Sequence, residues 1–420
     1  MNIVLYTIFL KVYSVAIFIA SISNEKAKLW IKGRKKIFEK LSHTFSSETA
    51  PIIWVHCASL GEFEQGRTVI EQLKKELIKP KVLLTFFSPS GYEIRKDYKE
   101  ADWVFYLPMD SFLNASQFLK IVNPAIAIFV KYEYWFYYLD QCKKRNISLL
   151  LISGIFRPSH PFFQLYGGFH RKMLRCFTHF FVQDEQSKKL LQSININNCT
   201  IAGDTRFDRV SSIADNFKQI DFIEKFISNN PILIAGSTWP KDDKIIREAV
   251  ADLHQKIKVI LVPHEIHPQR INELKQFFPT ALCYSQLTNS TFPTDSNFLI
   301  IDNIGMLTSL YHYATIAYVG GGFNNGIHNT LEAAVHGKPV LFGMKYEKFN
   351  EAKDLIKNGS SFCVADSNSL RLQIEKLLTN NSKYQNCCKN AKEYVRSKVG
   401  ATEKIVDYIQ ENRLLTNSSN

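Results

Sequence analysis

The amino-acid sequence predicts two successive α/β domains, each built around a mostly parallel, doubly wound sheet. From about residue 51 onward, apolar runs of strand length alternate with segments of helical length. Such alternation is typical of parallel sheets with helices on both faces. The chain has 420 residues, of which 45% are hydrophobic, so each of two ordinary-sized domains can bury a core. We predict one domain over 25–215 and a second over 216–420, with the boundary in the strand-poor stretch around 210–230.

The most apolar segment of the chain comes first, at residues 3–22. About 20 apolar residues can cross a bilayer as a helix, and Lys11 is the one charge inside this segment. The basic residues follow it, which by the positive-inside rule places the bulk of the protein in the cytoplasm. We therefore expect an N-terminal membrane anchor helix over 1–24, which either spans the bilayer or lies in its interface.

Two sets of strand-like runs follow the anchor. The first domain is expected to contain strands at 52–57, 81–87, 103–108, 125–130, 147–153 and 179–184. The second is expected to contain strands at 232–237, 258–264, 298–302, 316–321, 339–343 and 361–365. Because the carboxyl ends of parallel strands meet at one edge of a sheet, we expect a ligand in a central crevice that the two domains face.

The net charge predicts an anionic partner. Lys and Arg outnumber Asp and Glu by 52 to 39, which gives +13 and suits phospholipid head groups, phosphorylated substrates or nucleic acid. No nucleic-acid-binding signature accompanies the charge, so we predict no nucleic acid. The eight cysteines are scattered without metal-type spacing, which is typical of a reducing compartment.

A glycine-rich loop follows the apolar run 316–319. Gly320–Gly322 and Gly326 precede a short helix expected over 329–336. A strand, a glycine loop and a helix start aim free backbone N–H groups at an anion such as a diphosphate or phosphodiester. Glu332, in the first turn of that helix, has a carboxylate that can accept hydrogen bonds from two ribose hydroxyls. The alternative is a tight turn followed by a glutamate that favours the helix dipole.

Glu62 is the candidate general base. It follows the strand 52–57 and a turn of small residues, where a carboxylate can take a proton from an attacking hydroxyl. Ser59 and Glu62 also have the spacing of a helix capping box, in which the glutamate is structural. Residue types and spacing leave both interpretations open.

Polar residues also follow other strands. Ser90 and Gly91 follow the second strand, and either contact a ligand or form an ordinary turn. Ser237 and Thr238 follow the strand 232–237, and either donate to phosphate oxygens or cap a helix.

Two further groups lie after strands of the second domain. His264, His267 and Arg270 bring possible positive charge. No Cys, His or Asp cluster completes a set of ligands around the two histidines, so we predict no metal. Asn350 and Glu351 are either ligand contacts or the capped, acidic start of a helix.

In their order and spacing, these motifs resemble the Kdo transferase family, membrane-anchored enzymes that add 3-deoxy-manno-octulosonic acid (Kdo) to lipid A precursor. The matching motifs are His56-x-x-Ser59-x-Gly61-Glu62, Ser90-Gly91, Glu133-x-Trp135, the segment 203–208 with Arg206, Ser237-Thr238, Pro263-His264, the segment from Gly326 through His328 and Asn329 to Glu332, and the segment 349–351. The resemblance covers nearly the whole chain, from the anchor to about residue 395.

The resemblance implies a GT-B fold of two Rossmann-like domains and an inverting, metal-independent transfer without a cofactor. It implies CMP-Kdo as the donor, bound chiefly by the C-terminal domain, and lipid A precursor (lipid IVA) as the acceptor, with Glu62 as general base. Such a protein acts in lipopolysaccharide biosynthesis at the cytoplasmic face of the inner membrane, against anionic phospholipids.

The resemblance also implies roles for the motif residues. The expected donor contacts are Ser237, Thr238, His264, Arg270, Gly321, Gly322, Gly326, His328, Asn329, Glu332, Asn350 and Glu351. The residues expected to contact the acceptor or shape its site are Ser59, Gly61, Ser90, Gly91, Glu133 and Arg206.

The chain departs from the family pattern at several positions, including the segment 153–157, which stands where the family has Asn-Ala-Arg. Lys131 and Met306 stand where the family has glutamate, Arg206 where it has lysine, and His264 where it has arginine. Two alternatives therefore stay open: a nucleotide-sugar epimerase of the same fold, which would not need residues 3–22, and a membrane-bound binding protein without activity.

Overall fold

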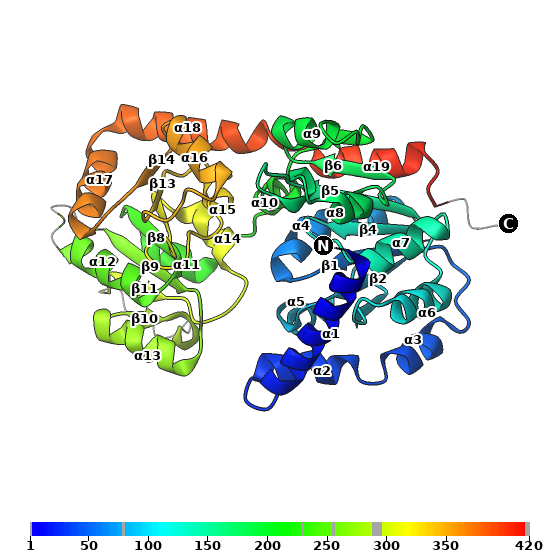
Figure 1. Cartoon of the computed structure of the whole chain (residues 1–420). Helices are drawn as coiled ribbons and strands as arrows, with labels where there is room; N and C mark the ends of the chain where they lie inside the picture. Colours follow the sequence, from blue (N-terminus) through cyan, green and yellow to red (C-terminus); the bar gives the residue numbers. More distant parts are fainter. Residues whose placement is uncertain are drawn as a thin grey trace. The chain divides into compact units, whose positions relative to one another are not determined.

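The computed structural model describes residues 2–77, 80–228, 230–251, 253, 257–287 and 296–415, which form two compact units (Figure 1). Unit 1 comprises Met1–Arg209 and Val399–Asn420, and unit 2 comprises Val210–Lys398. Each unit is an α/β domain with a parallel sheet, so the predicted pair of α/β domains is confirmed.

The described residues of unit 1 form a seven-stranded sheet in the order β3-β2-β1-β4-β5-β6-β7. Its strands are β1 (Ile52–Cys57), β2 (Lys81–Phe86), β3 (Trp103–Tyr106), β4 (Ile126–Val130), β5 (Ser148–Gly154), β6 (His179–Val182) and β7 (Cys199–Ile201). Its helices are α1 (Ile3–Ala20), α2 (Glu25–Arg34), α3 (Ile37–Phe45), α4 (Leu60–Glu76), α5 (Pro89–Arg95), α6 (Phe112–Val122), α7 (Phe136–Lys144), α8 (Gly168–Leu174), α9 (Glu185–Gln192) and α19 (Ala401–Glu411). Helix α10 (Thr205–Asp215) runs across the unit boundary.

The described residues of unit 2 form a second seven-stranded sheet, in the order β10-β11-β9-β8-β12-β13-β14. Its strands are β8 (Ile232–Thr238), β9 (Lys258–Pro263), β10 (Leu282–Cys283), β11 (Phe298–Ile300), β12 (Ile316–Val319), β13 (Val340–Phe342) and β14 (Ser361–Cys363). Its helices are α11 (Asp221–Ile227), α12 (Pro240–Ala251), α13 (Pro268–Phe277), α14 (Leu307–Leu310), α15 (Leu331–Ala334), α16 (Asn350–Lys357), α17 (Ser367–Thr379) and α18 (Asn381–Arg396).

Both faces of the first sheet are buried, which explains its nearly unbroken apolar strands. Successive residues of β1 point to opposite faces: Ile52 and Trp54 pack in one core, and Ile53 and Val55 pack in the other. All twelve predicted strands are present, with ends that differ by a few residues. The sequence did not predict β7 and β10, which are short and lie at the edges of their sheets.

Each sheet changes strand order at one point, and ligands of doubly wound folds bind at that point. In unit 1 the change lies between β1 and β4, and in unit 2 it lies between β8 and β12. The segments after β1 and β4 contain Glu62 and Glu133, β8 ends at Thr238, and the segment after β12 contains the glycine loop. The fold therefore places most of the predicted site residues at these two points.

The division of the chain differs from the predicted one. We had assigned 216–420 to the second domain, but helix α19 packs in the core of unit 1 through Ala401, Ile405 and Ile409. The Asp208 carboxylate accepts hydrogen bonds at the start of α19, from the backbone N–H groups of Gly400 (2.6 Å) and Thr402 (2.8 Å). The apolar face of α19 packs against α4.

Helix α1 packs against the rest of unit 1 through one stripe of residues (Figure 1). Tyr6 and Leu10 are buried, and Ser14 and Ile17 continue the same stripe as half-buried residues. The Tyr6 hydroxyl donates to the Asp110 carboxylate over 2.6 Å. By length and composition, α1 meets the requirement for crossing a membrane, and its remaining faces expose apolar side chains.

Candidate active site

Glu62 lies in the first turn of α4, directly after β1. Its Oε2 atom accepts hydrogen bonds from the backbone N–H of Ser59 (2.8 Å) and from the Ser59 hydroxyl. The predicted capping box is thus present, with Ser59 as the N-cap. Both bonds go to Oε2, so the cap leaves Oε1 of this half-buried carboxylate available for chemistry. Gly61 is exposed in the same turn.

A buried polar network lies beneath this turn. His56 on β1 is fully buried, and its Nε2 atom is 3.2 Å from a carboxylate oxygen of Glu133. The same oxygen accepts a hydrogen bond from the Trp135 indole N–H over 2.6 Å. On its other side, His56 Nδ1 lies 2.9 Å from the Thr85 hydroxyl. Glu133 is 8% exposed, so it shapes the site through His56 and Trp135.

The segment after β2 borders the same edge of the sheet. Ser88 caps α5, Ser90 is exposed, and their hydroxyls are 2.9 Å apart. Gly91 is buried against the Phe86 ring, which a Cβ atom at this position would approach to 2.3 Å. Ser90 can contact a ligand, whereas Gly91 is needed for packing.

Arg206 is paired inside unit 1. Its guanidinium is 2.7 Å from the Asp204 carboxylate, and its backbone N–H donates to the same group over 3.0 Å. Burial acts to raise the pKa of Asp204, but the neighbouring Arg206 guanidinium prevails and lowers it. The Arg206 side chain is partly exposed, so the pair presents an arginine whose charge is largely offset.

In unit 2, the glycine loop uses most of its N–H groups internally. Gly320 donates to the carbonyl of Gly236 (2.9 Å), Gly321 to the Asp242 carboxylate (2.9 Å) and Gly326 to the carbonyl of Gly321 (3.2 Å). These three N–H groups are therefore not free to bind an anion, which argues against the interpretation of the loop as an anion site.

Backbone geometry explains the glycines of this loop. Gly321 has a φ of +91°, which favours glycine, and Gly322 packs so closely on Gly343 that a Cβ atom would come within 2.6 Å. The helix beyond the loop, α15, comprises only four residues, whereas we had expected a helix over 329–336. The structure therefore favours the tight-turn interpretation of this loop.

Glu332 is held in place by two neighbours. One carboxylate oxygen accepts a hydrogen bond from the Thr308 hydroxyl (3.0 Å), and the other accepts one from the Asn329 side-chain amide (3.1 Å). The Asn329 side-chain oxygen in turn accepts the backbone N–H of Leu331. The half-buried carboxylate is thereby oriented, as a ribose-binding group would need to be.

Three aromatic rings stack beside the glycine loop. His264 lies between Trp239 and His328, at centroid distances of 4.8 Å and 4.3 Å. The Trp239 indole N–H donates to Nε2 of His328 over 3.1 Å, which fixes this nitrogen as an acceptor. Burial, with a contribution from His264, lowers the pKa of His328 to about 4, and burial also lowers the pKa of His264. Both imidazoles are thus neutral at pH 7, so the positive charge that we expected at His264 is absent.

Two other predicted donor contacts are buried. Arg270 is 3% exposed and forms an ion pair with Asp243, which is fully buried. Thr238 is also fully buried, and its carbonyl accepts the backbone N–H of His264. This burial favours a role in supporting the loop after β8, and a direct contact of either side chain with the donor stays a prediction. Ser237, in contrast, is half-buried, with a φ of +54°.

The segment after β13 begins α16. Asn350 is exposed at the first position of this helix, and Glu351 is 8% exposed beside it. Phe349, rather than Asn350, is the N-cap. Asn350 can therefore contact a ligand, whereas Glu351 is an acidic first-turn residue.

Sequence reasoning missed Trp239 and Thr308 as site residues. Trp239 fixes His328, which is 89 positions away, and Thr308 orients Glu332, which is 24 positions away. Trp239 follows Ser237-Thr238 directly, and this adjacency was the available signal. Within the described part of the chain, no group of three or more His, Cys, Asp or Glu residues is arranged to hold a metal ion. Metal independence stays a prediction.

The neutral state of His328 predicts a pH dependence of stability. The folded protein binds fewer protons at this position than the unfolded chain between pH 6.5 and about 4. The contribution of neutral His328 to the free energy of unfolding is therefore complete above pH 6.5 and is lost as the pH falls toward 4. We expect His328→Gln to remove on the order of 1 kcal/mol of this acid sensitivity, measured by urea unfolding between pH 7 and 4.5. His43→Gln, at an exposed position of α3, is the control, and parallel profiles for wild type and His328→Gln would contradict the assignment.

Comparison with known proteins bears on the identity of unit 1. Residues 34–209 match the family model of 3-deoxy-D-manno-octulosonic-acid transferases (Kdo transferases). The resemblance to the Kdo transferase family is confirmed. The match to the Kdo transferase model covers the segments that contain Glu62, Glu133 and Arg206.

Similar proteins extend the match along the chain. A 3-deoxy-D-manno-octulosonic acid transferase of Rickettsia bellii is 26% identical, over 86% of this chain and 87% of that protein. One of Aquifex aeolicus is 27% identical, over 81% and 91%. A bifunctional glycosyltransferase/methyltransferase of Fusobacterium nucleatum is 26% identical over 92% of this chain, which spans 59% of that protein's length.

Solved structures show the same fold. A UDP-N-acetylglucosamine 2-epimerase superposes with a TM-score of 0.62 at 15% identity, covering 89% of this chain and 99% of that one. A glycosyltransferase from Rickettsia africae superposes with a TM-score of 0.59 at 17% identity, covering 88% and 100%. At these identities the two structures show the fold alone, whereas the Kdo transferase model and the similar Kdo transferases support a glycosyltransferase.

Proposed function

We propose that this protein transfers Kdo from CMP-Kdo to lipid A precursor (lipid IVA) in lipopolysaccharide biosynthesis. The observation that carries the proposal is the position of Glu62, within the segment that matches the Kdo transferase model. Its carboxylate follows β1 at the point where the strand order of the first sheet changes. One oxygen is fixed by the helix cap, and the other remains available.

The proposed reaction is a single displacement. Glu62 takes the proton of an acceptor hydroxyl, whose oxygen attacks the anomeric carbon of Kdo. A new glycosidic C–O bond forms while the bond to the CMP phosphate breaks, and its electron pair leaves with CMP. Because attack occurs opposite the leaving group, the anomeric configuration inverts.

Unit 2 would bind the donor. Glu332, oriented by Thr308 and Asn329, is suited to accept hydrogen bonds from the ribose hydroxyls of CMP. We assign the hydroxyl of Ser237 and the exposed side chain of Asn350 as further contacts to CMP-Kdo. Hydrogen-bond donors of this kind would stabilise the charge that develops on the leaving phosphate without a metal ion.

Acceptor-dependent release of the nucleotide tests the proposal. Purified full-length protein would be incubated with CMP-Kdo, with and without lipid A precursor, and CMP would be measured. We expect CMP release only with the acceptor. The same protein would be given UDP-N-acetylglucosamine, because that epimerase fold is shared. Epimerisation without CMP release would replace the proposal with the epimerase alternative. Absence of both reactions would favour a binding protein.

We propose further that α1 attaches the protein to the inner membrane by lying in its cytoplasmic interface. The stripe from Tyr6 to Ile17 contacts unit 1 over most of the helix, and Thr7 is hydrogen-bonded to Tyr137 of α7 at 2.6 Å. A helix that spans the bilayer would have to break these contacts or draw the Asp110 carboxylate into the bilayer. The opposite faces carry exposed side chains such as Phe9 and Phe18, which suit the acyl region.

This orientation predicts the location of the N-terminus. A cysteine at position 2 (Asn2→Cys) should react with a membrane-impermeant maleimide in inverted vesicles and remain at the wild-type background in spheroplasts. Glu403→Cys, on the exposed side of α19, is the cytoplasmic control. Labelling of Asn2→Cys in intact spheroplasts would establish a spanning helix instead.

A further inference from the structure

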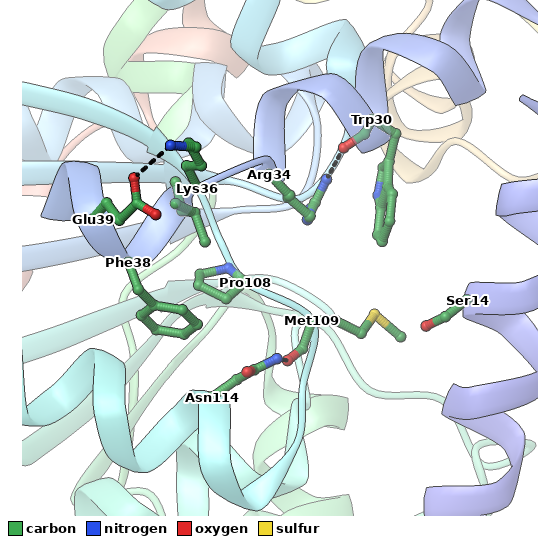
Figure 2. A pocket seen from close by; sticks show the side chains of 10 residues that line it. Ser14, Trp30, Arg34, Lys36, Phe38, Glu39, Pro108, Met109 and Asn114 are labelled. Carbon is green, nitrogen blue, oxygen red and sulfur yellow. Dashed lines mark hydrogen bonds and ion pairs between the residues drawn. The ribbon is translucent and has the colours of Figure 1, made fainter.

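A pocket of about 530 Å³ lies in unit 1, among α1, α2, α3 and the segment after β3. Figure 2 shows its arrangement: Arg34 and Trp30 of α2 lie on one side, and Met109 and Asn114 lie on the other. The side chains of Phe38 and Pro108 form an apolar wall, and Ser14 of α1 completes the lining. None of the residues assigned to the transfer reaction lines this pocket.

Arg34 supplies positive charge to the pocket. Its guanidinium donates to three main-chain carbonyls, those of Leu107 (2.9 Å), Trp30 (3.1 Å) and Phe87 (2.7 Å). A guanidinium has five N–H groups, so these bonds do not exhaust its donors. Burial lowers the pKa of Arg34 to about 9, and the group therefore remains charged at pH 7. Among the described residues, no carboxylate forms an ion pair with Arg34.

Trp30 adds a second donor. Its indole N–H is buried and has no hydrogen-bond partner among the described residues, and its ring lies 3.8 Å from the Arg34 guanidinium. Glu39, the one acidic residue at the pocket, is paired with Lys36 at 3.2 Å. A buried donor and a cation without a counter-ion are both costly unless a ligand satisfies them.

The surroundings define the rest of the ligand. Ser14 places α1 in the pocket wall, and the outer faces of α1 carry exposed apolar side chains, including Val12 at 61% and Phe18 at 65% exposure. A ligand that matches this lining would have an anionic part that contacts Arg34 and an apolar part that contacts Phe38, Pro108 and Met109. A lipid that carries a phosphate ester has both parts, and Arg binds phosphate oxygens well.

We propose that this pocket binds the phosphate ester of an acylated membrane lipid, with Arg34 and the Trp30 N–H on the phosphate oxygens and the first part of an acyl chain against the apolar wall. Such a lipid would fix the junction of α1 and α2 to the domain. Its source is either a glycerophospholipid of the bilayer or the phosphorylated acceptor, and the two share this chemistry.

Native mass spectrometry of the full-length protein in detergent tests the proposal without donor or transfer. The probes are dioctanoyl phosphatidate, dioctanoylglycerol, which has the acyl chains without the phosphate, and glycerol 3-phosphate, which has the phosphate without acyl chains. We expect one phosphatidate to bind wild type at least tenfold more tightly than either other probe. Arg34→Gln should weaken it at least tenfold, and Ser14→Trp, which fills the pocket from α1 and leaves Arg34 unsubstituted, should do the same. Lys32→Gln removes an equal charge from an exposed position of α2 and should bind as wild type does.

Equal binding by wild type and both pocket variants would overturn the proposal, because the lipid would then sit on the exposed face of α1. Equal binding of dioctanoylglycerol or of glycerol 3-phosphate would overturn it too, because either the phosphate or the acyl chain would then be irrelevant to binding. Ser14→Trp keeps the test decisive where Arg34→Gln does not fold. A competition arm identifies the source: displacement of phosphatidate by lipid A precursor at equimolar concentration assigns the pocket to the acceptor, and persistence of bound phosphatidate assigns it to a bilayer lipid.

Discussion

Glu62→Gln is expected to lower the rate of Kdo transfer by about 10²–10⁴-fold and to leave the fold intact. The glutamine keeps an oxygen that can accept the Ser59 N–H, because a capping box accepts Glu or Gln at this position. What it loses is the carboxylate that would take the proton in the proposed reaction. The measurement is the initial rate of product formation, together with the free energy of unfolding of both proteins.

Ser59→Ala is the matched control, because it weakens the cap and keeps the carboxylate. This variant should lose about 1 kcal/mol of stability and, because it keeps the carboxylate, lose far less activity than Glu62→Gln. If Glu62→Gln is fully active while Ser59→Ala and Glu62→Gln are both destabilised, Glu62 is a capping residue only and the base lies elsewhere.

Arg270→Met is expected to have the largest effect on stability, at about 3–5 kcal/mol. It leaves the fully buried Asp243 carboxylate without its ion-pair partner. Burial already raises the pKa of Asp243 to about 6, against the opposing effect of Arg270. Loss of Arg270 would raise it further, and uptake of a proton would limit the cost. Urea unfolding of the full-length protein at pH 7 measures the change.

The double variant Asp243→Leu/Arg270→Met removes both charges and should recover most of the lost stability, since a buried ion pair and an apolar pair differ little. A donor contact would behave differently. If Arg270→Met raised the KM for CMP-Kdo at least tenfold without loss of stability, the interpretation of Arg270 as a structural ion-pair partner would be contradicted.

Most of the fold could be predicted from local patterns. The twelve predicted strands are apolar runs bounded by polar or small residues, and their alternation with helices fixes the parallel sheets. The short edge strands β7 and β10 have too few residues for a pattern. The place of α19 could not be deduced from the order of the chain, because its partner α4 is more than 300 residues away.

The site was predicted less fully than the fold, for a physical reason. Residue type and position after a strand located Glu62 and Glu332 at the points where strand order changes. The same signals do not decide the role of Arg270, because an arginine after a strand serves a ligand or a buried carboxylate equally well. Its partner Asp243 is 27 positions away. Long-range partners decide which side chains remain free, and they are not visible in a sequence.

The central claim is the transfer of Kdo to a lipid acceptor, and the mass of the lipid product tests it most directly. Membranes from cells that express the protein would receive CMP-Kdo generated in situ and tetraacylated lipid A precursor, with EDTA present. We predict a product heavier than the acceptor by one or more Kdo units, absent from membranes that contain Glu62→Gln. An acceptor of unchanged mass in the presence of folded wild-type protein would contradict the proposed function.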